Sequence, residues 1–126
     1  MKAHHSDRAP AAIGPYAQAV EVDGWLFTSG QIGLDPDGGE LVDGGFAAEA
    51  AQVLANLREV LGAAGCAPAD IVKATIYLAD LADFGRLNEL YGDFVAGHRP
   101  ARSTVQAAAL PKGARIEIDL VARIPG

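Results

Sequence analysis

The pattern of apolar and polar residues changes its period several times along the chain. Weak alternation over 16–22 predicts a strand, and residues 25–29 predict a second one. The dipeptide Asp23-Gly24 between them is typical of a tight β-hairpin turn. The segment 33–45 is dense in glycine, aspartate and proline, which predicts a turn region that includes a short strand around residues 40–42.

Two amphipathic helices follow. Apolar residues recur at three- and four-residue steps over 46–64, which predicts the first helix. The β-branched run 71–78 predicts a strand, and 83–96 predicts the second helix, with Asp80 or Asp83 as its N-terminal cap. The apolar stripe of this second helix consists of Phe84, Leu87, Leu90, Tyr91 and Phe94.

Two further strands are expected at the end of the chain, over 102–107 and 115–124. The last one has the clearest two-residue period, with Glu117 and Asp119 opposite a row of apolar side chains. That row consists of Ile116, Ile118, Leu120, Ala122 and Ile124.

The predicted fold class is α+β, in two layers, with a mixed sheet of about half a dozen strands and both helices on one face. No helix is left to cover the other face. We expect that face to be semi-polar, with Thr104, Gln106, Glu117 and Asp119 beside the apolar Val121. Packing between the sheets of different subunits would cover it, so the pattern predicts a closed oligomer.

Composition limits the function classes. The chain has 126 residues, which fits one domain over 1–126, and a net charge of −6 from 16 acidic against 10 scattered basic residues. Such a surface repels nucleic acid and anionic membranes. No apolar run is long enough to span a bilayer and no signal peptide is visible, so we expect a cytoplasmic protein. The one cysteine, Cys66, fits a small buried hydrophobe.

Two charged residues in the last two strands are candidates for chemistry. Arg102 could bind a carboxylate through two parallel hydrogen bonds, or it could form a surface ion pair. Glu117 could orient and deprotonate a water molecule, or it could be an ordinary exposed carboxylate. The residues alone leave both alternatives open.

Five motifs, in order along nearly the whole chain, resemble the RidA/YjgF family of reactive-intermediate deaminases. They are APAAIGPYAQAV (9–20), TSGQIG (28–33), DIVKATIYLADLADFGRLNELY (70–91), RPARSTVQ (99–106) and LPKGARIEID (110–119). The resemblance implies a chorismate-mutase-like fold with a six-stranded sheet backed by two helices. It also implies a homotrimer with sites between subunits and hydrolysis of 2-imino acids to 2-keto acids and ammonia.

The resemblance also assigns roles. Arg102 resembles the family's anchor for the substrate carboxylate, and Glu117 its acidic catalytic residue, with Asp119 as the alternative. The chain departs from the best-known members at Thr104, where they carry cysteine, although the backbone N–H can still donate to a carboxylate. The other residues expected around the substrate are Tyr16, Ser29, Gly30 and Asn88.

No cofactor is expected, because the sequence holds no zinc ligand set and no complete calcium or phosphate loop. His4 and His5 are expected in a frayed N-terminal segment. Two other functions stay open: a ribonuclease or translation inhibitor, which the acidic charge balance disfavours, and a non-catalytic trimer that binds small ligands in the same cleft.

Overall fold

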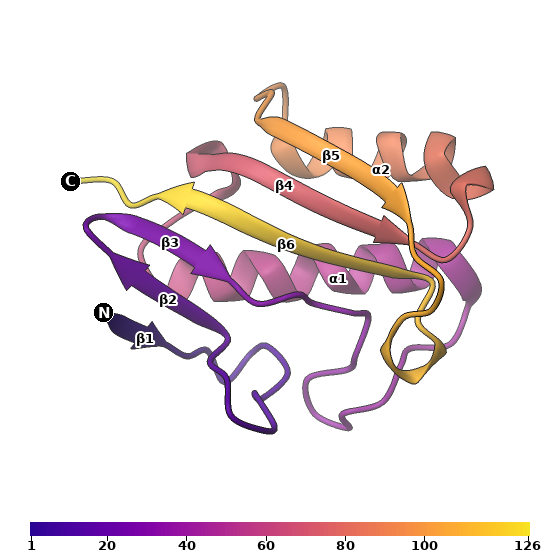
Figure 1. Cartoon of the computed structure of the whole chain (residues 1–126), viewed down its shortest axis with the longest axis horizontal. Coiled ribbons are helices and arrows are strands. Elements are labelled where there is room, and N and C mark those ends of the chain that lie inside the picture. The colour runs from indigo at the N-terminus through magenta and orange to yellow at the C-terminus, as the bar shows by residue number, and fades with distance from the viewer.

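Six strands pair into one mixed sheet in the order β1-β2-β3-β6-β4-β5, in a computed structural model that describes residues 1–126 (Figure 1). The strands are β1 (Lys2–His4), β2 (Ala19–Val22), β3 (Trp25–Thr28), β4 (Ile71–Leu78), β5 (Ala101–Gln106) and β6 (Ile116–Arg123). The helices are α1 (Gly45–Ala63) and α2 (Phe84–Val95). The α+β class and the positions of both helices are therefore confirmed.

Strand β6 lies in the interior of the sheet, whereas β5 lies at its edge. The only parallel pair is β4 with β5. Parallel neighbours need a long crossover connection, and here α2 supplies it. Asp80 caps the short turn before α2 by accepting a hydrogen bond from the Ala82 N–H at 2.8 Å.

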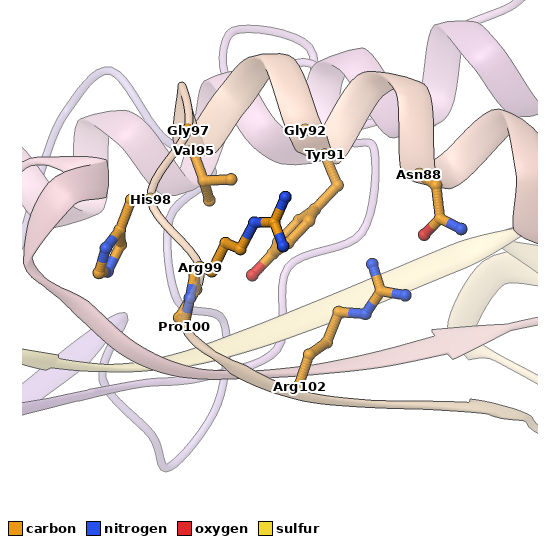
Figure 2. A pocket seen from close by; sticks show the side chains of 9 residues that line it. All are labelled: Asn88, Tyr91, Gly92, Val95, Gly97, His98, Arg99, Pro100 and Arg102. Atoms are coloured by element: carbon orange, nitrogen blue, oxygen red, sulfur yellow. The ribbon is translucent and has the colours of Figure 1, made fainter.

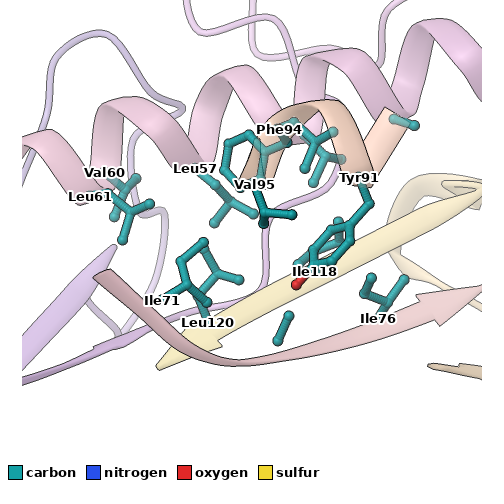
Figure 3. Packing of buried hydrophobic residues seen from close by; sticks show 14 of the residues in the cluster. Leu57, Val60, Leu61, Ile71, Ile76, Tyr91, Phe94, Val95, Ile118 and Leu120 are labelled. Carbon is teal, nitrogen blue, oxygen red and sulfur yellow. The ribbon is translucent and has the colours of Figure 1, made fainter. Parts of the chain in front are cut away.

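The core lies between the two helices and one face of the sheet (Figure 3). Along β6, every second residue from Ile116 to Ala122 is buried, as the two-residue period predicts. Leu57 and Leu61 of α1 and Leu87 of α2 are fully buried. Cys66 is buried too, which confirms it as a small core residue, and burial raises the pKa of its thiol. Neither helix is long and apolar enough to cross a membrane.

Two predictions at the first half of the chain are wrong. Residues 40–42 form no strand, because that segment makes only an isolated bridge between Leu34 and Leu41. The sixth strand is instead β1, in the segment expected to fray. There, His4 is in register with Ala19, and its Nε2 lies 2.8 Å from Glu21 Oε1. Pairing with β2 thus orders the N-terminus.

The sheet face away from the helices is uncovered in the single chain. The pairing of Glu117 with Tyr77, and of Tyr77 with Val105, places all three on this open face. Phe27 and Val105 add exposed apolar surface there, at 42% and 45% exposure. The expectation of Thr104 and Gln106 on this face is wrong: Thr104 pairs with the buried Ile76, so it points to the helix side.

Candidate functional site

The first half of the candidate site is a cavity of about 340 Å³ between α2 and the start of β5 (Figure 2). It has nine lining residues: Asn88, Tyr91, Gly92, Val95, Gly97, His98, Arg99, Pro100 and Arg102. In Figure 2, Asn88 and Tyr91 descend from α2, and Arg99 and Arg102 come from the segment that leads into and begins β5. The cavity therefore brings Arg102 and Asn88 together, as expected of substrate-binding residues.

Arg102 is half-buried and has no carboxylate partner. Its Cζ lies 5.4 Å from the centre of the Phe84 ring and 5.2 Å from that of Tyr91, so two aromatic faces stabilise the guanidinium. No Asp or Glu oxygen lies within 4.0 Å of it. Arg102 therefore forms no ion pair within the chain, and its donors are available to an anion.

The second half is a smaller pocket of about 180 Å³ around Glu117. Tyr16, Gly30, Gln31 and Lys112 also line it. A Cβ on Gly30 would lie only 2.8 Å from Glu117 Cδ, so any side chain at this position would push the carboxyl group aside. Tyr16 precedes β2 rather than beginning it, and at 55% exposure it forms the outer wall of the pocket.

Glu117 lies in a setting that favours its protonated form. Partial burial raises its pKa, and the negative charge of Asp119 raises it further. Burial also raises the pKa of Asp119, although the Tyr77 hydroxyl and the Lys73 ammonium act in the opposite direction. A glutamate with a raised pKa is a better proton acceptor near neutral pH than an ordinary one.

The helix α1 fixes the segment that carries Gly30. Asn56, which is buried, donates hydrogen bonds to the carbonyl oxygens of Ile32 and Leu34, at 3.4 Å and 3.0 Å. The backbone of Gln31 exchanges two hydrogen bonds with Ile118, at 2.8 Å and 3.1 Å. These bonds hold Gly30 against Glu117, the residue before Ile118.

Arg102 and Glu117 do not meet within one chain. Arg102 pairs with the buried Ala74, so its side chain leaves the sheet on the helix side. Glu117 pairs with Tyr77 on the open face. Side chains of neighbouring residues in a strand point to opposite faces, and the register carries this alternation across β4. One chain thus presents the two groups on opposite sides of its sheet.

Ser29 and Thr104 have different surroundings from the other site residues that the sequence predicts. Ser29 Oγ donates a 2.6 Å hydrogen bond to the Ala17 carbonyl, which ties the end of β3 to the segment before β2. Thr104 Oγ1 is buried and has no hydrogen-bond partner. Neither residue lines the two cavities around Arg102 and Glu117.

Tyr91, Arg99 and Lys112 are among the lining residues that the sequence did not single out. Tyr91 was assigned to the apolar stripe, where it does pack, but its hydroxyl is buried without a hydrogen-bond partner. A tyrosine in a core stripe is the available signal, because its hydroxyl needs a partner. No cluster of three His, Cys, Asp or Glu side chains suited to a metal ion is present.

These features define a small α+β protein in which Arg102, in one cavity, and Glu117, in a second pocket, lie on opposite faces of one sheet. The chain matches the model of the Endoribonuclease L-PSP family over residues 6–124. It belongs to that family, which is the RidA/YjgF family that its motifs resemble.

Named relatives agree with this membership. The 2-iminobutanoate/2-iminopropanoate deaminase of Mus musculus is 55% identical over 115 residues, which are 91% of this chain and 85% of the relative. The crystal structure of RidA from Psychrobacter sp. PAMC 21119 has 44% identity and a TM-score of 0.94, with coverage of 98% and 100% of the two chains. E. coli TdcF with bound serine has 40% identity and a TM-score of 0.92, with coverage of 99% and 100%.

Proposed function

We propose that this protein hydrolyses small 2-imino acids to 2-keto acids and ammonia. Relatives more than half identical over most of the chain carry the name 2-iminobutanoate/2-iminopropanoate deaminase. The observation in this structure that supports it best is Arg102, a half-buried guanidinium without an acidic partner in a cavity of small-molecule size. The serine bound to TdcF has the α-carboxylate that such a guanidinium would hold.

Arg102 is the anchor in this mechanism. Its guanidinium donates two parallel hydrogen bonds to the substrate carboxylate, helped by the backbone N–H of Thr104. Asn88 adds a polar group beside it in the same cavity. Fixing the carboxylate fixes the adjacent imine carbon, and such positioning lowers the entropy cost of the attack by water.

Glu117 is the base. It accepts a proton from a water molecule as the water oxygen bonds to the imine carbon, and it passes this proton to the imine nitrogen to give the carbinolamine. The carboxylate then takes the hydroxyl proton and delivers it to the amino nitrogen, so the C–N bond breaks, ammonia leaves and the carbonyl forms. Tyr16 and Gly30 line the pocket around this reaction centre, and Ser29 is the neighbour of Gly30 in the chain. General acid–base catalysis of this kind contributes roughly 10²- to 10⁴-fold.

The site is shared between subunits of a homotrimer. Arg102 and Glu117 leave one sheet on opposite faces, so a single substrate can contact both only if they come from neighbouring copies. The open face, with its exposed Phe27 and Val105, supplies the surface on which copies pack. One copy contributes Arg102 and Asn88, and the next contributes Tyr16, Gly30 and Glu117.

The anchor is tested with imines that an amino-acid oxidase generates in situ, by measuring the release of keto acid. Wild type should accelerate the release, and Arg102→Ala should abolish this acceleration. Arg86→Ala is the matched control, because Arg86 is an exposed residue of the neighbouring helix whose only ion pair is with Glu89. Wild-type turnover by Arg102→Ala would show that the anchor is wrong.

The shared site is tested by mixing two inactive variants. Arg102→Ala and Glu117→Gln are refolded together at equal amounts. A site that takes its arginine from one copy and its glutamate from the next is intact in about a quarter of random pairings, so about a quarter of wild-type activity should return. A site within one chain would be broken in every copy, and no activity would return. Light scattering on the same samples measures whether they are trimers.

The family description also names a ribonuclease. The net charge of −6 does not favour binding of a phosphate backbone. A salt titration with labelled RNA separates the two functions, because a ribonuclease would bind near physiological salt. A non-catalytic ligand-binding trimer would instead bind keto acids without accelerating imine hydrolysis, and Glu117→Gln would then change nothing.

A further inference from the structure

We propose that the cavity between α2 and β5 binds a second anionic group, and that the enzyme therefore prefers 2-imino acids whose side chain ends in a carboxylate. Arg99 is the residue that holds this distal carboxylate. The inference deepens the proposed function and rests on it for the reaction itself. The existence of a two-anion site is a separate claim about ligand binding.

The charge of the cavity supports a dianion. Two of its nine lining residues are arginines, and none is Asp or Glu. Neither Arg99 nor Arg102 has a carboxylate oxygen within 4.0 Å. Arg99 is exposed and Arg102 is half-buried, and two like charges that line one cavity favour the binding of an anion between them. One carboxylate already satisfies the planar fork of Arg102 with its two oxygens, which leaves Arg99 for another.

The Tyr91 hydroxyl is a further sign that the cavity binds an anion. Tyr91 is only 6% exposed, and its hydroxyl is buried with no hydrogen-bond partner. Its ring lies against Arg102 and lines the same cavity. A buried hydroxyl without a partner costs free energy, and an anion in the cavity would remove that cost by accepting its proton. Figure 2 shows the tyrosine and both arginines around one cavity.

The backbone near Arg99 is held in place. His98 Nε2 donates a 2.7 Å hydrogen bond to the Ile71 carbonyl, which ties the segment before β5 to the start of β4. Pro100, which follows Arg99, restricts its backbone further. At about 340 Å³ the cavity is within the range of small-molecule sites, so a five-carbon dicarboxylate fits.

The binding test compares pyruvate with 2-oxoglutarate, two keto acids that differ by a distal carboxylate, by calorimetry at fixed salt. Wild type should bind 2-oxoglutarate about tenfold more tightly, the effect expected of one charge-assisted hydrogen-bonded contact. Arg99→Gln should remove most of this difference, and Arg99→Lys should restore part of it. Arg86→Gln removes the same charge elsewhere on the surface and should keep the difference.

The kinetic test uses imines made from L-alanine and L-glutamate by the corresponding oxidases, and compares kcat/KM. Arg99→Gln should lower the value for the glutamate imine about tenfold more than that for the alanine imine. Equal binding of the two keto acids by wild type, no binding of either, or an equal loss for both in Arg99→Gln would overturn the inference. A binding preference without turnover of any imine would instead support the two-anion site and overturn the proposed reaction.

Discussion

The carboxylate of Glu49, on α1, accepts a 2.8 Å hydrogen bond from the backbone N–H of Arg115, two residues before Glu117. Glu49 is 6% exposed, and its other oxygen lies 3.6 Å from Arg115 Nε. The helix thus holds the start of β6 through one buried side chain, as Asn56 holds the segment after Gly30. Two of the segments that carry residues of the Glu117 pocket are thus held by α1.

Replacing Glu49 with alanine should lower the free energy of unfolding by about 1–3 kcal/mol, because the Arg115 N–H loses its partner. Chemical denaturation measures this change. Glu89→Ala is the control, since Glu89 is exposed on α2 and should change stability by less than about 0.5 kcal/mol. An equal effect of the two substitutions would mean that the buried contact adds nothing to stability.

Gly30→Ala should reduce turnover at least tenfold while the fold is kept. The new methyl group would displace the flexible end of Glu117 rather than backbone, so the cost falls on the position of the base. Steady-state kinetics and a thermal melt should be measured together. Gly62→Ala, inside α1 with open space around it, should leave turnover unchanged and stabilise the helix by roughly 0.5–1 kcal/mol. Normal turnover in Gly30→Ala would mean that the carboxyl position is not critical.

The pH profile of kcat/KM should have an acid limb set by Glu117. The base acts only when it is deprotonated, and its pKa is raised, so activity should fall at a higher pH than for an ordinary glutamate. Asp119→Asn removes the negative charge that helps to raise this pKa, so the limb should move to lower pH. The spontaneous hydrolysis of the imine is measured at each pH and subtracted. A limb that stays in place in Asp119→Asn would argue against Glu117 as the base.

Glu117→Gln should be inactive and yet more stable than wild type at pH 7. The folded pKa of Glu117 lies above its unfolded value, so the folded state binds the proton more tightly. The protonated carboxyl group of Glu117 therefore contributes to stability below the pKa that it has in the unfolded chain. This contribution is lost as the pH rises through the pKa that it has in the folded protein. The gain in melting temperature should therefore disappear below about pH 4, where the wild-type carboxyl group is protonated. A lower melting temperature of the variant at pH 7 would contradict this account.

The sequence predicted most of the fold because the stronger patterns are local. The three- and four-residue steps of α1 and α2 and the two-residue period of β6 require only neighbouring residues to be read. Two short segments were harder to predict from the sequence. Lys2–His4 has too few residues for a period, and its strand exists only because β2 offers it a partner. Residues 40–42 have strand-like composition, but no neighbouring strand pairs with them.

The candidate site was likewise predictable from the sequence only in part. The motif around Arg102 identified the guanidinium as a candidate, and the alternation in β6 placed Glu117 opposite the core. Tyr91 and Arg99 were missed because one lies in an apolar stripe and the other in the loop before β5. Only the packing of α2 over β5 shows that they line one cavity.

By itself, the sequence determined both helices, the longer strands and which residues within those strands share a face, since these follow from local periodicity. Only the tertiary structure decided which face of β5 turns toward the core, because that depends on its pairing with another strand, β4. The register of β5 with β4 turned Thr104 and Arg102 toward the helices, and that of β6 turned Glu117 away from them. The two candidate groups are separated by the sheet itself for this reason.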